Sequence, residues 1–449
     1  MKKRIFALAI LMVLLCTTMT GCFFKAADEL YCLPKQSEEY NDLQAAINAV
    51  MLQMHADYAA PISGSNQQAV QLADLDGDGN DEALAFLKTE GELPLKLVVF
   101  QKQGEDYQQI AMVESDGSNF SSVEYLQLDG KAGMEILVGR QIGDQVPQSM
   151  GVYALQEGRM VELMSTTYQE YTTADLDLDG LSDIVVLRYD SEEQHGVVER
   201  YCTRNGMLER DPEVLMSNSV DAVKRIITGY VQPGVPAIFV ASVYQDTSIL
   251  TDIFAVQNHV LINVTAQTED NVPAPTVRNY FVYATDIDGD GVMELPDPQQ
   301  LPYFGREGDN GNYIIHWYNV SLDGQRTDKL TTYHNYSSGW YLILPDWWGD
   351  KITVTRGNEL SGTVGYTFSR WDAIQEPLEE VFTIYEFSGY DRDEVIQNAE
   401  VDLTVLGEKG ETTYVAQIAQ GEQPAQITAE QLQNWFHFIS VDWNTGEVQ

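Results

Sequence analysis

The spacing of hydrophobic residues changes once, beyond residue 62, from a helical period to a period of two. Between residues 38 and 58, apolar side chains recur every three or four positions, as they do on one face of a helix. These side chains are Tyr40, Leu43, Ile47, Val50, Met51 and Met54. Beyond residue 65, short apolar or alternating runs are separated by Gly, Asp and Asn, which is typical of strands joined by turns. The clearest runs are 68–72, 83–87, 95–100, 184–187, 237–243 and 313–320. We therefore predict one N-terminal helix followed by a mainly β chain.

A repeat accompanies these strand-like runs. Strong copies read DLDGDGNDEALAFL at 74–87, DLDLDGLSDIVVL at 175–187 and DIDGDGVMEL at 286–295. Weaker copies begin at residues 127 and 229, so the five starts are separated by 53, 48, 54 and 57 residues. Four strand-like runs in roughly 50 residues match the size of one propeller blade. The pattern predicts a β-propeller of about five four-stranded blades over residues 65–325.

The last part of the chain, residues 326–449, has a different pattern. Longer strand-like runs occur at 352–355, 363–368, 381–387, 401–406 and 413–418. A helix is then expected, because Thr428 and Gln431 form a capping-box pair ahead of an apolar face. That face contains Leu432, Trp435, Phe436 and Ile439. We predict a small α+β domain here, and additional unmarked blades are the alternative.

Aromatic residues crowd into positions 313–348. Such side chains can stack on sugar rings, but large apolar side chains usually lie in a core. Trp340, Leu342 and Leu344 alternate as they would on one face of a strand. We therefore expect these aromatic residues to be mainly part of the core.

The first 21 residues have the character of a signal peptide. Three cationic residues precede an apolar run from residue 5 to residue 15. The following Met19-Thr20-Gly21-Cys22 resembles the lipobox of bacterial lipoproteins, in which the cysteine is lipidated. This resemblance implies a signal peptide at 1–21, a lipid on Cys22, and a tether with the N-terminal helix at 22–64. The mature chain would then be anchored on the outer face of a bacterial membrane, touching the membrane only through its lipid. An ordinary cleaved signal with a coincidental cysteine is the alternative.

Charge and composition narrow the function classes. The formal net charge is −42, so the chain lacks the cationic surface that nucleic-acid phosphates require. A hydrophobic content of 44% is sufficient for a large core over 449 residues. Apart from Cys16 in the signal and Cys22, two cysteines remain, Cys32 and Cys202. They either pair as a disulfide, which an extracytoplasmic location permits, or remain as two separate thiols.

Each strong copy of the repeat places carboxylates at alternate positions of a short loop, where they would repel one another. A Ca²⁺ ion would remove this repulsion, because it binds six to eight oxygens at about 2.3–2.6 Å. An EF-hand loop needs a bidentate Glu at position 12, where this chain has Ala85, Val186 and Asp297. An acidic residue is found instead at position 9 of all three copies, followed by an apolar strand. The EF-hand is therefore a poor description of these loops.

The pattern D-x-D-x-D-G-x-x-[DE] resembles the FG-GAP and VCBS repeats of integrin alpha-chain propellers and bacterial surface proteins. The resemblance implies about three structural Ca²⁺ sites, each with four carboxylates and one backbone carbonyl. The first site would use Asp74, Asp76, Asp78, the carbonyl of Asn80, and Glu82. The second would use Asp175, Asp177, Asp179, the carbonyl of Leu181, and Asp183. The third would use Asp286, Asp288, Asp290, the carbonyl of Val292, and Glu294. Gln127 and Lys131 replace two ligands in the copy at 127, which is therefore expected to be metal-free.

Catalytic patterns are absent from the sequence. The six histidines show no zinc spacing, and there is no nucleophile elbow, P-loop or dinucleotide fingerprint. The sequence thus predicts a calcium-stabilised lipoprotein that binds a protein or glycan partner at the cell surface without catalysis. Two alternatives stay open: a propeller-scaffolded enzyme that acts on polysaccharides, and a structural protein that organises the cell envelope.

Overall fold

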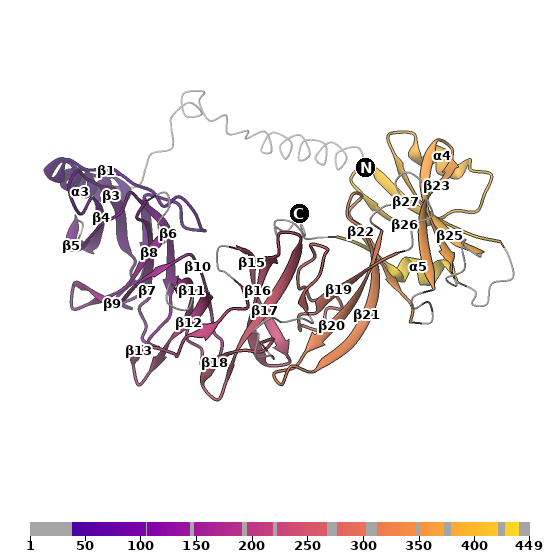
Figure 1. Ribbon diagram of the computed structural model, residues 1–449. Helices are drawn as coiled ribbons and strands as arrows, with labels where there is room; N and C mark the ends of the chain where they lie inside the picture. The colour runs from indigo at the N-terminus through magenta and orange to yellow at the C-terminus, as the bar shows by residue number, and fades with distance from the viewer. Residues whose placement is uncertain are drawn as a thin grey trace, which may run out of the picture. The chain divides into compact units, whose positions relative to one another are not determined.

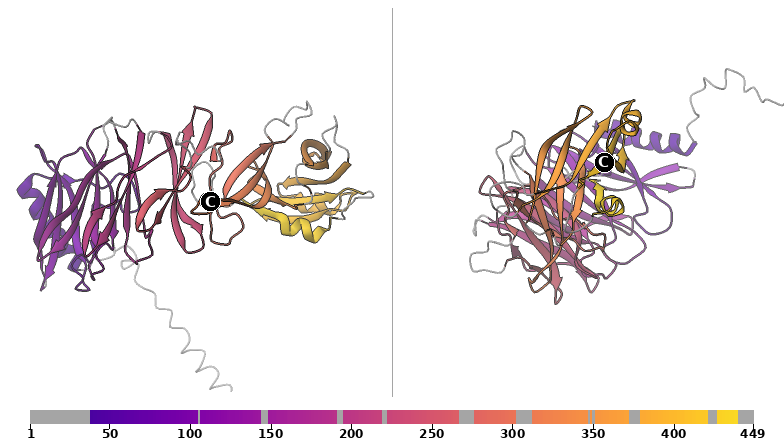
Figure 2. Two further views of the ribbon diagram at one scale, coloured as in Figure 1. Left: turned by 60° about the horizontal axis from the view of Figure 1, so that its bottom comes forward. Right: turned by 90° about the vertical axis from the view of Figure 1, so that its right-hand side faces the viewer.

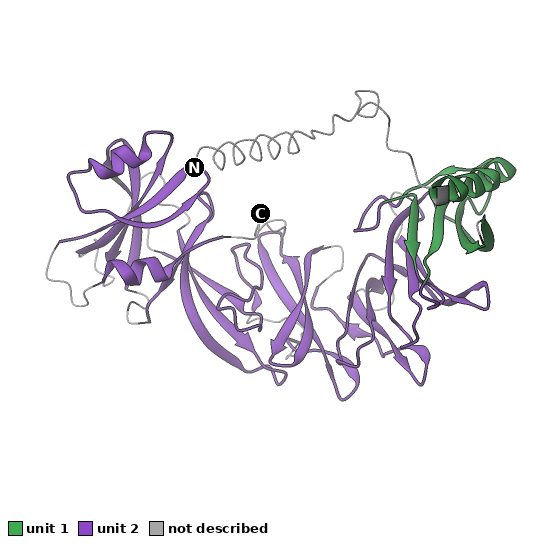
Figure 3. Ribbon diagram, turned by 180° about the vertical axis from the view of Figure 1, so that it is seen from behind, with its two compact units in different colours: residues 1–60, 68–73, 80–116 green, residues 61–67, 74–79, 117–449 purple. Residues whose placement is uncertain are grey.

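The computed structural model describes residues 38–104, 106–143, 148–190, 195–218, 222–266, 276–301, 312–346, 348, 351–371, 379–420 and 427–439. The described residues form two compact units (Figure 3). Unit 1 lies within residues 1–60, 68–73 and 80–116, and unit 2 lies within residues 61–67, 74–79 and 117–449. The predicted signal peptide, the lipidated Cys22, the tether and Cys32 lie outside the described residues.

The described part of unit 1 contains one helix and one antiparallel sheet, which we call the first sheet (Figure 1). The helix α3 (Glu38–Met54) confirms the prediction of an N-terminal helix, although it ends four residues earlier than the predicted residue 58. The chain then forms a short strand that pairs with β3. The strands of the first sheet are β1 (Asp57–Tyr58), β2 (Val70–Ala73), β3 (Glu82–Lys88), β4 (Leu95–Gln103) and β5 (Asp106–Ser115). Leu43 and Ile47 of the helix pack on Ala85, Val98 and Phe100 of the sheet, so the predicted apolar face is the one that is buried.

The described part of unit 2 contains five further antiparallel sheets, of four or five strands each. The second sheet contains β6 (Asn119–Leu126), β7 (Glu135–Gln141), β8 (Gln148–Gln156) and β9 (Arg159–Tyr168). The third contains β10 (Glu170–Ala174), β11 (Asp183–Asp190), β12 (His195–Arg204), β13 (Met207–Arg210) and β14 (Val214–Leu215). The fourth contains β15 (Val223–Gln232), β16 (Val235–Tyr244), β17 (Ser248–Gln257) and β18 (Val260–Asn263). The weak repeat copy at 229 lies in the hairpin of β15 and β16.

The fifth and sixth sheets complete unit 2. The fifth contains β19 (Leu295–Gln300), β20 (Tyr313–Val320), β21 (Arg326–Asn335), β22 (Trp340–Leu344) and β28 (Phe436–Phe438). The sixth contains β23 (Ile352–Leu360), β24 (Thr363–Arg370), β25 (Glu379–Ser388), β26 (Thr404–Lys409) and β27 (Thr412–Ile418). Because β20 pairs with β21, residues on both sides of the predicted 325/326 boundary belong to one sheet. The strands of each sheet are neighbours in the order given by their pairing, and Figure 2 shows the region of these two sheets in orange to yellow.

Consecutive sheets of unit 2 are joined by apolar clusters, and the third sheet shows how. In β11, Ile184 and Val186 pack with residues of the second sheet, such as Leu137. The intervening Val185 and Leu187 pack with residues of the fourth sheet. A strand segment buried on both faces reads as a continuous apolar run, as residues 184–187 of this strand do. Full burial of one such side chain stabilises the fold by roughly 1.5–3 kcal/mol, so these contacts tie neighbouring sheets together.

The aromatic residues and the C-terminal helix largely follow the sequence-based expectation. Trp340 and Leu342 are fully buried between the fifth and sixth sheets, which confirms their assignment to the core. Trp347 lies outside the described residues. The helix α5 (Ala429–Trp435) begins with the predicted capping box, in which Gln431 N donates to Thr428 Oγ1 at 3.2 Å. The expected apolar face is interrupted because Phe436 leaves the helix and begins β28, which pairs with β22. A second short helix, α4 (Arg392–Gln397), follows β25.

None of the helices within the described part of the chain has the length and apolar character required to cross a bilayer.

Candidate metal centre

The three aspartate loops occupy equivalent places in three sheets. In each, the residue before position 1 pairs with the acidic residue at position 9, which closes a nine-residue loop between two antiparallel segments. These pairs are Ala73 with Glu82, Ala174 with Asp183, and Thr285 with Glu294. The loop at 127–135 is closed in the same way, by Leu126 and Glu135. The repeat in the sequence therefore corresponds to a repeated loop that is closed by antiparallel pairing, between strands in three copies and by an isolated bridge at 285/294.

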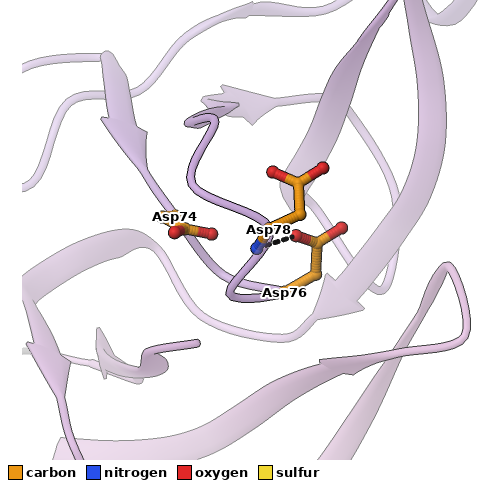
Figure 4. A group of neighbouring side chains, drawn as sticks. All are labelled: Asp74, Asp76 and Asp78. Atoms are coloured by element: carbon orange, nitrogen blue, oxygen red, sulfur yellow. Dashed lines mark hydrogen bonds between the residues drawn. The ribbon is translucent and has the colours of Figure 1, made fainter. Parts of the chain in front are cut away.

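The aspartates at positions 1, 3 and 5 come together in each strong copy. One carboxylate oxygen from each aspartate lies within 4.8 Å of the others. The three groups are Asp74, Asp76 and Asp78 (Figure 4); Asp175, Asp177 and Asp179; and Asp286, Asp288 and Asp290. Two oxygens bound to one Ca²⁺ are at most about 5 Å apart, because each lies about 2.3–2.6 Å from the ion. The spacing of the aspartates therefore fits a calcium ion.

Hydrogen bonds between side chains and the backbone hold these loops in shape. In the third loop, Asp286 accepts from Gly289 N at 2.8 Å and from Gly291 N at 3.0 Å. Asp288 accepts from Asp290 N at 3.1 Å. Gly289 and Gly291 have φ angles of 76° and 86°, a left-handed conformation that glycine adopts without steric cost. The first loop repeats these bonds, with Asp74 accepting from Gly77 N and Gly79 N.

Position 4 of the second loop differs from the others. Its residue is Leu178, which has a φ of 58°, whereas the first and third loops have glycine there. A non-glycine residue in this region costs roughly 1–2 kcal/mol. Asp175 nevertheless accepts from Gly180 N at 3.0 Å, so the turn keeps its form.

The acidic residue at position 9 is buried beneath the loop rather than grouped with the three aspartates. Glu294 is fully buried, and it accepts from Ile287 N at 3.0 Å and from Asn319 Nδ2 at 2.7 Å. Burial raises its pKa to about 7, and the two hydrogen bonds oppose the increase. Glu82 is also fully buried, and it accepts from Gln101 Nε2 at 3.3 Å. Both residues therefore stabilise the strand closure, and their role as ligands stays a prediction.

The predicted carbonyl ligands lie in the same turns. The backbone N–H groups of Leu181 and Val292 each donate to the position 5 aspartate at 2.8 Å. Asn80 lies at the equivalent place in the first loop and is exposed. The role of these three carbonyl groups as ligands also stays a prediction.

Cationic side chains of the chain itself reach two of the loops. Lys329 on β21 places its Nζ 3.3 Å from Asp288 Oδ2 and 2.5 Å from Asp290 Oδ2. Its ammonium group lowers the pKa of the Asp290 carboxyl. In the second loop, Arg200 on β12 contacts both Asp177 and Asp183. Burial raises the pKa of Asp183 to about 6, and its bonds to Arg200 counteract that effect.

The sequence analysis identified neither Lys329 nor Arg200, but the sequence around Arg200 has a feature that could have indicated it. Glu199 and Arg200 are adjacent charged residues in the otherwise apolar start of β12, and both are fully buried. Charged residues are almost never fully buried unless they are paired. Two adjacent charges beside the apolar pair Val197 and Val198 are thus a sequence feature that can indicate an ion-pair network, although not its partners.

The loop at 127–135 retains the turn without three aspartates. Gln127 takes the place of the first aspartate, and its Oε1 accepts from Gly130 N at 3.1 Å. Its Nε2 donates to the carbonyl oxygens of Lys131 at 2.6 Å and Gly133 at 3.3 Å. Glu135 accepts from Leu128 N at 2.8 Å, as the position 9 carboxylate does in the second and third aspartate loops.

Comparison with known proteins gives no family. No family model and no curated protein matches this chain. Among solved structures, the exotype rhamnogalacturonan lyase YesX is 13% identical with a TM-score of 0.28, over 74% of this chain and 67% of the lyase. The Bacillus licheniformis rhamnogalacturonan lyase PL11 is 11% identical with a TM-score of 0.29, over 70% of each chain. TolB from Acinetobacter baumannii is 9% identical with a TM-score of 0.22, over 74% of this chain and 66% of TolB. Likenesses this distant carry no argument about this chain.

Proposed function

We propose that this chain is a calcium-stabilised binding protein, held outside the cytoplasm by a lipid on Cys22. It recognises a protein or glycan partner at the bacterial cell surface and carries out no catalysis. In this proposal its sheets are blades of a propeller-type repeat of about five blades. The sixth sheet, with α4 and α5, makes up a small α+β domain.

The observation that carries the proposal is the grouping of three aspartates in each of three equivalent loops. Three carboxylates within 4.8 Å of one another repel strongly unless a cation lies among them. Hard oxygen ligands at this spacing favour Ca²⁺ over transition metals, which prefer nitrogen or sulfur. The ion would hold the loop that joins two neighbouring strands, and so it would stabilise the edge of the sheet.

A binding role is favoured over catalysis by how the acidic residues are used. The best-placed carboxylates are engaged by backbone N–H groups or by cations of the chain, as at Asp286, Glu294 and Asp183. General acid–base catalysis needs a carboxyl within hydrogen-bonding reach of a substrate. Carboxylates that hold a loop in this way are suited to fixing a surface for recognition.

Calcium titration by calorimetry on the full chain tests the first half of the proposal. We expect saturable binding at the aspartate loops and an increase in melting temperature. A chain that binds no calcium, with an unchanged melting temperature, would contradict the calcium role.

Partner recognition needs a separate experiment. We expect the calcium-loaded chain to give a signal on a glycan array or to retain a cell-envelope protein, without release of product. Turnover of a polysaccharide would instead establish the enzyme alternative.

A further inference from the structure

Arg200 occupies a position that is apolar in the equivalent sheets. In the third sheet, Val185 lies two residues after the position 9 aspartate, Asp183. Its partner on the neighbouring strand β12 is Arg200. The corresponding partners are Val99 in the first sheet, Val152 in the second and Trp317 in the fifth. A cation at this register is therefore particular to the second aspartate loop.

The guanidinium group of Arg200 engages two of the four carboxylates that the calcium set would use. Its Nη2 contacts Asp177 Oδ2 and donates to Asp183 Oδ1 at 2.9 Å. Its Nε lies 2.9 Å from Asp183 Oδ2, so both oxygens of Asp183 are engaged. Its Nη1 lies 3.6 Å from Asp211 Oδ2, and Asp211 is itself paired with Arg204. The fork geometry of arginine suits such bidentate pairing with a carboxylate.

These contacts compete with calcium for its predicted ligands. Both oxygens of Asp183 and Oδ2 of Asp177 are directed to Arg200, although Asp177 still lies close to Asp175 and Asp179. Calcium takes six to eight oxygens, and it would have to displace Arg200 to use Asp183 and Asp177 Oδ2. A divalent ion would also lie beside the guanidinium charge, which repels it.

The cation at the third loop is of a different kind. The Lys329 side chain is 27% exposed, whereas the Arg200 side chain is 0% exposed. A lysine ammonium on a flexible, solvated stem can leave the carboxylates when a divalent ion arrives. Arg200 has no such route to solvent, because it lies fully buried between the loop and the sheet.

We infer that Arg200 holds the second aspartate loop in the place of a calcium ion, so that calcium binds only at the first and third loops. The occupation of those two loops rests on the proposed function. The replacement at the second loop rests on the contacts and burial of Arg200.

The test of the inference is the number of calcium ions bound per full chain, measured by equilibrium dialysis and metal analysis. We expect two ions per wild-type chain and three per Arg200→Gln chain, because the substitution removes the internal cation and keeps all four carboxylates. Arg200→Lys is the matched control and should still bind two, because it retains a positive charge at a position that is buried, unlike that of Lys329. An Arg200→Gln chain that binds no more calcium than wild type overturns the inference.

A second pair of variants covers the case in which Arg200→Gln does not fold. Asp290→Asn should lose one ion, whereas Asp179→Asn should lose none. Loss of one ion from Asp179→Asn overturns the inference, and folding of Arg200→Gln only in the presence of calcium supports it. A wild-type chain that binds no calcium contradicts the proposed function. The inference is then still decided by whether Arg200→Gln gains a site.

Discussion

The loops at 127–135 and 286–294 adopt the same turn with very different charges. Both are closed by antiparallel pairing of the residue before position 1 with the acidic residue at position 9. In both, the position 9 carboxylate accepts from the backbone N–H at position 2. In both, the side chain at position 3 accepts from the N–H at position 5, at 2.9 and 3.1 Å. The loop at 127–135 has two carboxylates and one ammonium group, whereas the loop at 286–294 has four carboxylates. The turn is therefore formed by side-chain and backbone hydrogen bonds, and the loops differ in how the charge is compensated.

The loop at 127–135 compensates its charge with groups of its own. The Gln127 amide donates to the carbonyls of positions 5 and 7, the second of which is the carbonyl expected to bind calcium in the other copies. The Lys131 ammonium contacts the Asp129 carboxylate. A neutral donor and a lysine thus occupy the roles that an ion would have at 286–294. Under the proposed function, calcium would stabilise the loops in which carboxylates outnumber such groups, and the shape of the turn would not depend on it.

The largest expected effect is that of removing calcium from the wild-type chain. A ligand at about 1,000 times its dissociation constant adds about 4 kcal/mol per site to stability. We expect a chelator to lower the melting temperature by several degrees in calorimetry, and added calcium to restore it. The same melting temperature with and without chelator would contradict the view that the loop at 286–294 depends on calcium and the loop at 127–135 does not.

Giving the loop at 127–135 the aspartates of the loop at 286–294 should create a calcium site. In Gln127→Asp/Lys131→Asp, positions 1, 3 and 5 are all aspartate, and the Gly133 carbonyl loses its amide donor. We expect one additional calcium ion by dialysis and a new dependence of stability on calcium, of up to about 4 kcal/mol. Gln127→Asn/Lys131→Asn is the matched control and should gain no ion. A double aspartate variant that binds no more calcium would show that the carboxylates are insufficient.

The position 9 carboxyl of the metal-free loop gives a test by pH. Burial raises the pKa of Glu135 above its ordinary value of 4.5, and the bond from Leu128 N opposes the increase. Its stabilising contribution is therefore complete below pH 4.5 and is lost as the pH rises through the folded-state pKa. The free energy of unfolding of wild type, relative to Glu135→Gln, should fall with increasing pH by at most about 1.4 kcal/mol per pH unit. Denaturant unfolding at several pH values measures this difference, and a difference that rises with pH would contradict the assigned direction.

Local patterns predicted local structure well in this chain. The α3 helix, the Thr428 capping box and the aspartate groups depend on residues close in sequence, and each was visible there. Arg200 could not be assigned to the second loop in advance, because its contacts with Asp177 and Asp183 require β12 to lie beside β11. The pairing of β28 with β22 joins segments about 100 residues apart, and periodicity does not encode partners. The sequence predicts the acidic residue at position 9 only as a fourth ligand, because its burial under the loop depends on the pairing of the sheet.

The smallest expected effect is that of removing the Lys131 ammonium while keeping the Gln127 amide, the two groups that compensate the charge of the loop at 127–135. Lys131 is highly exposed, with 71% of its side chain accessible, and it contacts only Asp129 among the ion pairs of the described residues. Exposed ion pairs contribute little to stability, so Lys131→Ala should change the melting temperature only slightly. The calcium count should remain that of wild type, because Gln127 still occupies the carbonyls and supplies no carboxylate. An additional ion in this single variant would mean that the lysine charge alone excludes calcium. The amide of Gln127 would then lose its role as the substitute for the ion.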